Sequence, residues 1–105
     1  MCYYPNWAYW RAGIGKFTVD KIDANICTHI IYSFVALNSA TWGIKLLDSW
    51  LDINLNNIDN FIALKNSNPD LKLLVALGGW TDSQAQAASY KALFATPSLR
   101  STFIQ

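Results

Sequence analysis

Two runs of apolar residues, Thr28–Ala36 and Leu71–Leu77, constrain the fold of this sequence more than any other feature. Neither run carries polar residues at helical spacing, and the first is rich in β-branched and aromatic side chains, which favour strands. Near-continuous hydrophobicity is typical of strands that are buried on both faces, as in parallel sheets covered by helices. The sequence therefore predicts two buried strands of a parallel sheet.

The segments before and between these runs predict another strand and two helices. Cys2–Tyr4 is short, aromatic and followed by a proline, which indicates a first strand that leads into a loop. Thr18 is a candidate N-cap of a short helix up to Ala24. Apolar residues at helical spacing over residues 58–65 predict an amphipathic helix. Residues 42–53 show no clear periodicity, and no element is predicted there.

The chain after the second apolar run is predicted to be helical. Gly78-Gly79-Trp80 interrupts the run, Gln84–Ala95 favours a helix, and Pro97 opens a further helix that continues to Gln105. The alternation of strand and helix indicates right-handed parallel β/α units, so the predicted fold class is α/β. Three such strands are either an open flavodoxin-like half or the first three-eighths of a closed barrel, which needs ~250 residues.

Charge and composition exclude several classes of partner. The chain has 8 Lys and Arg against 7 Asp and Glu, and a formal charge of +1 provides no basic surface for nucleic acid or an anionic membrane. The apolar runs fall short of the ~20 residues that a membrane span requires. No Gly-rich phosphate loop or dinucleotide motif follows the first strand, and two cysteines with His29 are too few ligands for a metal site. Neither a cofactor nor a metal is therefore expected.

Two further features of the composition bear on function. All 7 acidic residues are aspartates, so a mechanism that needs a glutamate as proton donor cannot be completed by this chain. Cys2 and Cys27 are either two free thiols or one disulfide, and their number does not decide between the two. No basic stretch followed by an apolar core opens the sequence, so a secretion signal is expected to have been removed or to lie outside these residues.

Four motifs follow one another along the whole chain. They are Cys2-Tyr3-Tyr4-Pro5-Asn6-Trp7, Gly15-Lys16-Phe17, Cys27-Thr28-His29-Ile30-Ile31-Tyr32-Ser33-Phe34 and Leu73-Leu74-Val75-Ala76-Leu77-Gly78-Gly79-Trp80. In this order and spacing they resemble the N-terminal part of the family 18 glycoside hydrolases, the animal-type chitinases. A lone Gly-Gly-Trp is a weak signal, whereas the four motifs together are specific.

This resemblance implies a partial TIM (β/α)8 barrel, of which the chain supplies about the first three β/α units with parallel strands. Residues 1–105 are then expected to be the N-terminal part of the catalytic domain, ending before the catalytic fourth strand. The resemblance also implies that Cys2 and Cys27 form a disulfide and that the parent protein is extracellular. Because an unfinished barrel exposes strand edges, the isolated chain is expected to self-associate through them.

The resemblance further implies that the ligand is chitin or a chito-oligosaccharide. Aromatic side chains suit such a ligand, because the apolar face of a sugar stacks on an indole or phenol ring, and barrel ligands sit at the carboxyl ends of strands. Tyr3 and Phe34 are expected to face the sugar next to the scissile bond, and Trp7 is expected to stack on a more distant sugar. The three residues expected to border the cleavage point are Gly79, Trp80 and Thr81.

The catalytic signature of this family, Asp-x-x-Asp-x-Asp-x-Glu on the fourth strand, is absent here, and Asp48-Ser49-Trp50-Leu51-Asp52 does not substitute for it. In the family the glutamate protonates the leaving oxygen while the N-acetyl carbonyl of the sugar attacks the anomeric carbon, which retains the configuration. The chain is therefore expected to contribute binding subsites to a secreted chitinase and to be inactive alone. The alternatives are part of a non-catalytic chitinase-like lectin, or a free-standing small α/β domain.

Overall fold

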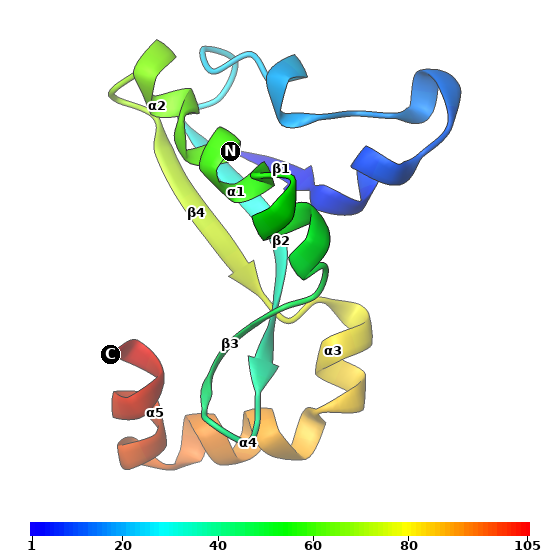
Figure 1. Ribbon diagram of the computed structural model, residues 1–105. Helices are drawn as coiled ribbons and strands as arrows, with labels where there is room; N and C mark the ends of the chain where they lie inside the picture. Colours follow the sequence, from blue (N-terminus) through cyan, green and yellow to red (C-terminus); the bar gives the residue numbers. More distant parts are fainter. The chain divides into compact units, whose positions relative to one another are not determined.

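The computed structural model describes all of residues 1–105 and contains one sheet of four strands. The strands are β1 (Cys2–Pro5), β2 (His29–Asn38), β3 (Gly43–Leu46) and β4 (Lys72–Leu77). The α-helices, shown in Figure 1, are α1 (Asn57–Ile62), α2 (Leu64–Ser67), α3 (Trp80–Ala85), α4 (Ala87–Ala95) and α5 (Pro97–Ile104). The remaining turns are the 3-10 helices η1 (Asn6–Trp10), η2 (Gly13–Gly15) and η3 (Val19–Lys21), and the π-helix η4 (Trp50–Asn54).

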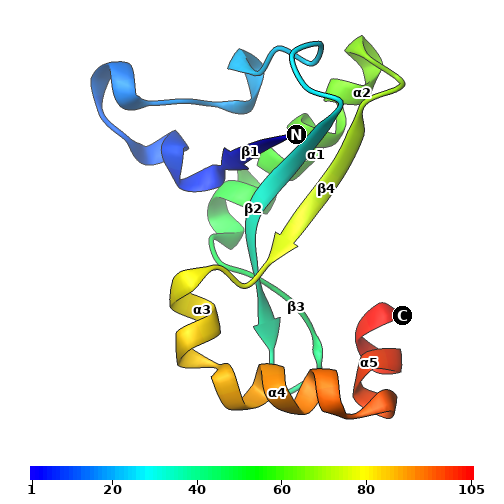
Figure 2. The ribbon, with the colours of Figure 1, turned by 180° about the vertical axis from the view of Figure 1, so that it is seen from behind.

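Strand β2 is the centre of the sheet, and the two strands predicted beside it are parallel to it. β1 pairs with β2 in parallel register, with Cys2 opposite Ile30. β4 also pairs with β2, as the two views in Figures 1 and 2 agree. The Lys72 amide donates to the Thr28 carbonyl at 3.0 Å, so β4 enters the pairing at the amino end of β2. The predicted parallel α/β sheet is therefore confirmed.

Strand β3 was not predicted, and it is antiparallel to β2. In this hairpin Asn38 lies opposite Gly43. The Asn38 side-chain oxygen accepts from the Ala40 amide at 3.1 Å, and the Asn38 carbonyl accepts from the Trp42 amide at 2.7 Å. Trp42 has a φ of 57°, a left-handed conformation that is uncommon for a large side chain. Because the turn depends on this conformation, the local sequence pattern did not indicate the hairpin.

The prediction that the second apolar run is buried on both faces was wrong. Leu74 and Val75 of β4 are 46% and 50% exposed, whereas Leu71 just before the strand is buried. β4 has β2 as its only partner strand in this chain. One edge and much of its surface therefore remain uncovered.

The helices also begin and end at other residues than predicted. The segment after Thr18 forms only the single turn η3, and the predicted helix over 58–65 is divided into α1 and α2 at Ala63. The helix expected from Gln84 begins at Trp80 as α3 and is interrupted at Gln86. Pro97 opens α5 as predicted, and that helix ends at Ile104. No helix has the length and apolarity to cross a membrane.

The chain forms two compact units, and β2 contributes to both. The first unit comprises residues 1–33 and 48–76 and has an aromatic core. The rings of Tyr4, Tyr32 and Phe61 are buried there, with centroids 5.6 Å apart for Tyr4 and Tyr32 and 5.2 Å for Tyr32 and Phe61. Since Phe61 belongs to α1, this cluster attaches the helix to β1 and β2.

The second unit comprises residues 34–47 and 77–105. It holds the carboxyl half of β2, the hairpin strand β3, and the helices α3 to α5. α5 lies beside β3, as Figure 2 shows. Its buried apolar side chains include Ala36 and Leu37 of β2 and Leu93 of α4.

Candidate functional site

The expected substrate-binding residues lie on the strands or directly after their carboxyl ends. Trp7 belongs to η1, which begins immediately after β1, while Gly79, Trp80 and Thr81 follow β4. The carboxyl ends of parallel strands are the usual location of ligands in α/β folds.

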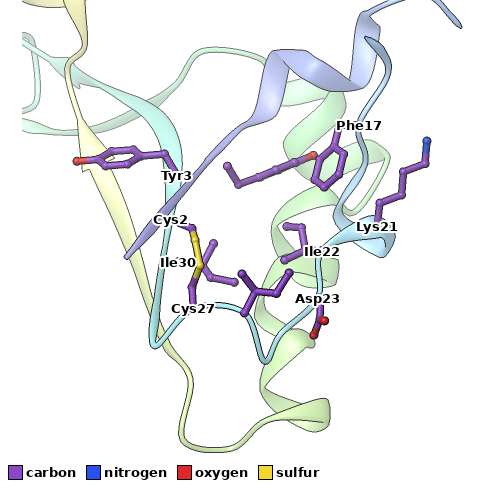
Figure 3. Close-up of a pocket in the computed structure, with 10 residues that line it drawn as sticks. Cys2, Tyr3, Phe17, Lys21, Ile22, Asp23, Cys27 and Ile30 are labelled. Atoms are coloured by element: carbon purple, nitrogen blue, oxygen red, sulfur yellow. A yellow bond between two sulfur atoms is a disulfide. The ribbon is translucent and has the colours of Figure 1, made fainter. Parts of the chain in front are cut away.

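Tyr3 and Trp7 are the expected site residues of the first unit. Successive side chains of a strand point to opposite faces, so Tyr4 packs into the aromatic core whereas Tyr3 is 63% exposed. Figure 3 shows the Tyr3 ring pointing away from Phe17 and Ile22. Trp7 is 47% exposed. Both rings therefore present surface on which an apolar ligand face can stack.

The turn η1, which carries Trp7, is held at its middle and at both ends. Ala8 is buried, and its carbonyl accepts from the Phe17 amide at 3.0 Å. At one end, Asn6 Nδ2 donates to Asp52 Oδ1 at 3.3 Å. At the other end, Trp10 Nε1 donates to Asp48 Oδ2 at 2.8 Å. The backbone beside Trp7 is thus fixed by contacts from the segment around η4.

Asp52 is part of a buried polar cluster that the sequence did not reveal. Its side chain is 1% exposed, and its Oδ1 also accepts a short hydrogen bond from the Tyr32 hydroxyl. Asn57 Nδ2 donates to the same hydroxyl at 2.7 Å. Burial, reinforced by the bond to Asp52, raises the pKa of Tyr32 above its ordinary value, so this hydroxyl stays protonated and donates. The cluster connects β2, η4 and α1 beneath η1.

In the second unit, the structure brings Phe34 and Gly79 into contact. Gly79 has a φ of 87° and a ψ of 174°, a region that is essentially restricted to glycine. A Cβ atom at Gly79 would lie 3.1 Å from Phe34 Cδ2. The absence of a side chain therefore lets the Phe34 ring pack directly on the backbone that precedes Trp80.

Trp80 is the first residue of α3, with 83% of its surface exposed, and Thr81 next to it is also exposed. Asp82 in the same turn anchors the helix: its Oδ2 accepts from the Leu37 amide of β2 at 3.3 Å. Gln86 Nε2 donates to Asp82 Oδ1 at 2.6 Å. Burial alone would raise the pKa of Asp82, but hydrogen bonds from Tyr90, Gln86 and the Leu37 amide hold it below its usual value. The carboxylate is therefore ionised at neutral pH.

A cavity of about 300 Å³ lies at the other end of the strands, beside the disulfide that joins Cys2 and Cys27 (Figure 3). Phe17, Ile22 and Ile30 line it. Cys2 begins β1 and Ile30 lies near the start of β2, so the cavity is at the amino ends of these strands. Tyr3, one of the expected site residues, also lines it. No group of three His, Cys, Asp or Glu side chains is placed to hold a metal ion.

Comparison with known proteins gives a consistent set of similarities. The family described as "Glycosyl hydrolases family 18" matches residues 1–105. An endochitinase of Manduca sexta is 36% identical over the whole chain, which spans 18% of that protein. The crystal structure of an Ostrinia furnacalis Group IV chitinase is 44% identical with a TM-score of 0.89, over 99% of this chain and 27% of that one. Human YKL-39, described as a pseudo-chitinase with retained chitooligosaccharide binding properties, is 30% identical with a TM-score of 0.74, over 98% and 26%.

Proposed function

The chain belongs to glycosyl hydrolase family 18, and we propose that it is the N-terminal part of the catalytic barrel of a secreted chitinase. In this proposal it contributes about the first three β/α units and a set of aromatic subsites for β-1,4-linked N-acetylglucosamine. The similarity to chitinases over the whole chain supports it, although the chain spans only 18% and 27% of the two chitinases compared. The disulfide between Cys2 and Cys27 is in keeping with an oxidising, extracellular compartment.

The contact between Phe34 and Gly79 is the observation that carries the proposal. A sugar ring stacks on a flat apolar surface, and Phe34 is an aromatic ring that is only partly buried and is held in place by its packing on Gly79. We assign Tyr3 and Phe34 to the sugar beside the scissile bond, and Trp7 to a more distant sugar. The three residues that border the cleavage point in this proposal are Gly79, Trp80 and Thr81.

The chemistry we propose is substrate-assisted hydrolysis with retention of configuration. The N-acetyl carbonyl of the bound sugar attacks the anomeric carbon, while a carboxylic acid protonates the leaving oxygen. Residues 1–105 contain no glutamate, so the acid must come from a part of the enzyme outside them. The role of this chain is then to hold the sugar by stacking, and it has no hydrolytic activity alone.

The second candidate function is that of a chitinase-like lectin. It is favoured by the similarity to human YKL-39, a pseudo-chitinase that retains chitooligosaccharide binding. Aromatic subsites serve both functions equally, because stacking does not depend on the acid. The two candidates differ only in whether the rest of the protein supplies the proton donor.

Two measurements on the full-length protein that carries residues 1–105 test these proposals. Binding of chitohexaose by calorimetry is expected to weaken on the order of tenfold for Trp80→Ala, and to change little for the control Trp42→Phe in the hairpin turn. Equal affinity of wild type and Trp80→Ala contradicts the assignment of Trp80. Release of fluorophore from a chitobioside then separates enzyme from lectin, and the 105-residue chain alone is expected to release none.

The isolated 105-residue chain is also proposed to self-associate. β1 and β4 each pair only with β2, and both Leu74 and Val75 of β4 are exposed. Unpaired strand edges with apolar side chains promote edge-to-edge pairing. Sedimentation velocity is expected to show dimers or larger species, and a stable monomer at all concentrations contradicts this proposal.

A further inference from the structure

We propose that Asp48 is a positioning residue that sets the orientation of Trp7, and that it acts through the indole of Trp10. The inference rests on the proposed function, in which Trp7 stacks on a sugar of the bound chito-oligosaccharide. It adds to that function a residue outside the stacking surface that controls how firmly one subsite is formed. All of the contacts that support it lie within the first unit.

The 3-10 helix η1 includes both Trp7 and Trp10. In a 3-10 helix there are three residues per turn, so side chains at positions i and i+3 lie on the same side of the helix. Trp7 and Trp10 have this spacing within Asn6–Trp10. The two side chains therefore leave η1 on the same side, and in this proposal the Trp10 ring acts on the Trp7 ring across that side.

The Trp10 ring is oriented by contacts with Asp48 and Tyr9. Trp10 Nε1 donates to Asp48 Oδ2 at 2.8 Å, and the indole also makes an edge-to-face contact with Tyr9, with centroids 4.9 Å apart. Trp10 is 55% exposed, so it lacks the close packing that fixes a buried indole. The hydrogen bond to Asp48 is therefore the directional restraint on this ring.

The two carboxylate oxygens of Asp48 accept hydrogen bonds from different donors. Oδ1 accepts from the Leu51 amide in the first turn of η4 at 3.0 Å, while Oδ2 accepts from the indole N–H. An asparagine has one acceptor oxygen and one amide donor. The oxygen of the asparagine in Asp48→Asn can replace only one of these two acceptors. Because Leu51 is buried and Trp10 is exposed, the oxygen is expected to stay with the Leu51 amide, so that an amide donor faces the N–H of Trp10. This variant removes the restraint on Trp10 with little change in volume.

The test uses the full-length protein that carries residues 1–105, with chitohexaose as the probe in calorimetry. Asp48→Asn is expected to weaken binding on the order of threefold to tenfold, the effect of one hydrogen bond. The matched control is Asp59→Asn, since Asp59 is an exposed aspartate of α1, and it is expected to leave the affinity unchanged. In a Trp7→Ala background, Asp48→Asn is expected to have no further effect, because the residue that it positions is absent.

A spectroscopic measurement keeps the inference separate from the proposed function. In protein labelled with 5-fluorotryptophan, Asp48→Asn is expected to shift the fluorine resonances of both Trp7 and Trp10, each assigned by its Trp→Phe variant. A shift of Trp10 alone, or the same loss of affinity with and without Trp7, overturns the inference. If Trp7→Ala leaves chitohexaose affinity unchanged, the subsite assignment of Trp7 fails, while the fluorine shifts still decide whether Asp48 positions its ring.

Discussion

The hydroxyl group of Tyr90 donates a 2.5 Å hydrogen bond to Oδ2 of Asp82, and this bond joins α4 to the first turn of α3. The same carboxylate oxygen accepts from the Leu37 amide, and Gln86 Nε2 donates to the Leu37 carbonyl at 2.8 Å. Asp82 follows Trp80 by two positions. The network therefore fixes the start of α3 against β2, at the point where the exposed tryptophan begins the helix.

Replacing Tyr90 by phenylalanine is expected to lower the free energy of unfolding by about 1 kcal/mol, the net value of one hydrogen bond. The ring and its contact with Phe94 remain, so the variant tests the hydroxyl alone. Urea unfolding followed by circular dichroism measures the difference. Tyr3→Phe is the control, because Tyr3 is 63% exposed and its variant is expected to unfold at the wild-type midpoint. Equal midpoints for Tyr90→Phe and Tyr3→Phe contradict the prediction.

The pH dependence of stability is expected to follow from the hydrogen-bonded pair of Tyr90 and Asp82. The pKa of Asp82 is depressed in the folded state, so its contribution is present above the ordinary value of 3.8 and is lost as pH falls through the folded pKa. Burial and the bond to Asp82 raise the pKa of Tyr90 to about 12, so its contribution is present below 10.0 and is lost as pH rises towards 12. The stability difference between wild type and Tyr90→Phe is expected to be largest near neutral pH. A difference that stays constant from about pH 3 to pH 11 contradicts this assignment.

Gly79→Ala is expected to be more destabilising than Gly13→Ala. Both glycines have positive φ, but a Cβ at Gly79 meets the Phe34 ring at 3.1 Å, whereas a Cβ at Gly13 meets nothing within 4 Å. Strained backbone costs about 1 to 3 kcal/mol at either position, and the contact with Phe34 adds to that cost only at Gly79. Urea midpoints of the two variants measure the excess. If the two glycines are equally tolerant of alanine, Phe34 does not pack on Gly79 in solution.

Removal of the disulfide is expected to lower the free energy of unfolding by about 3.5 kcal/mol, from the loop-entropy relation for a sequence separation of 25 residues. The double variant Cys2→Ser, Cys27→Ser and the reduced wild type are expected to unfold at the same urea concentration. The control is the double variant with added reductant, which is expected to unfold at the same urea concentration as the double variant without it. Two thiols that react with an alkylating agent in unreduced, secreted protein contradict the pairing.

The order of the strands and the parallel pairing of β1 and β4 with β2 could be read from the sequence, because runs of apolar residues and proline or glycine turns are local signals. The start of α5 at Pro97 is another, since proline suits the first turn of a helix. The family motifs are also contiguous, which is why they could be recognised in one chain. These features depend on residues close together in the sequence.

Contacts between side chains that are far apart in the sequence could not be predicted from it. Asn6 and Asp52 are 46 positions apart in the sequence, and Leu37 and Asp82 are 45 positions apart. The residues next to each of them in the sequence therefore do not indicate these hydrogen bonds. The open edge of β4 was expected from an unfinished barrel, but the apolar composition of the strand by itself indicated burial. Composition shows which side chains can be buried, whereas the neighbouring elements determine which of them are buried. A buried carboxylate such as Asp52 is stable only where donors from distant segments converge on it, and that convergence is a property of the fold.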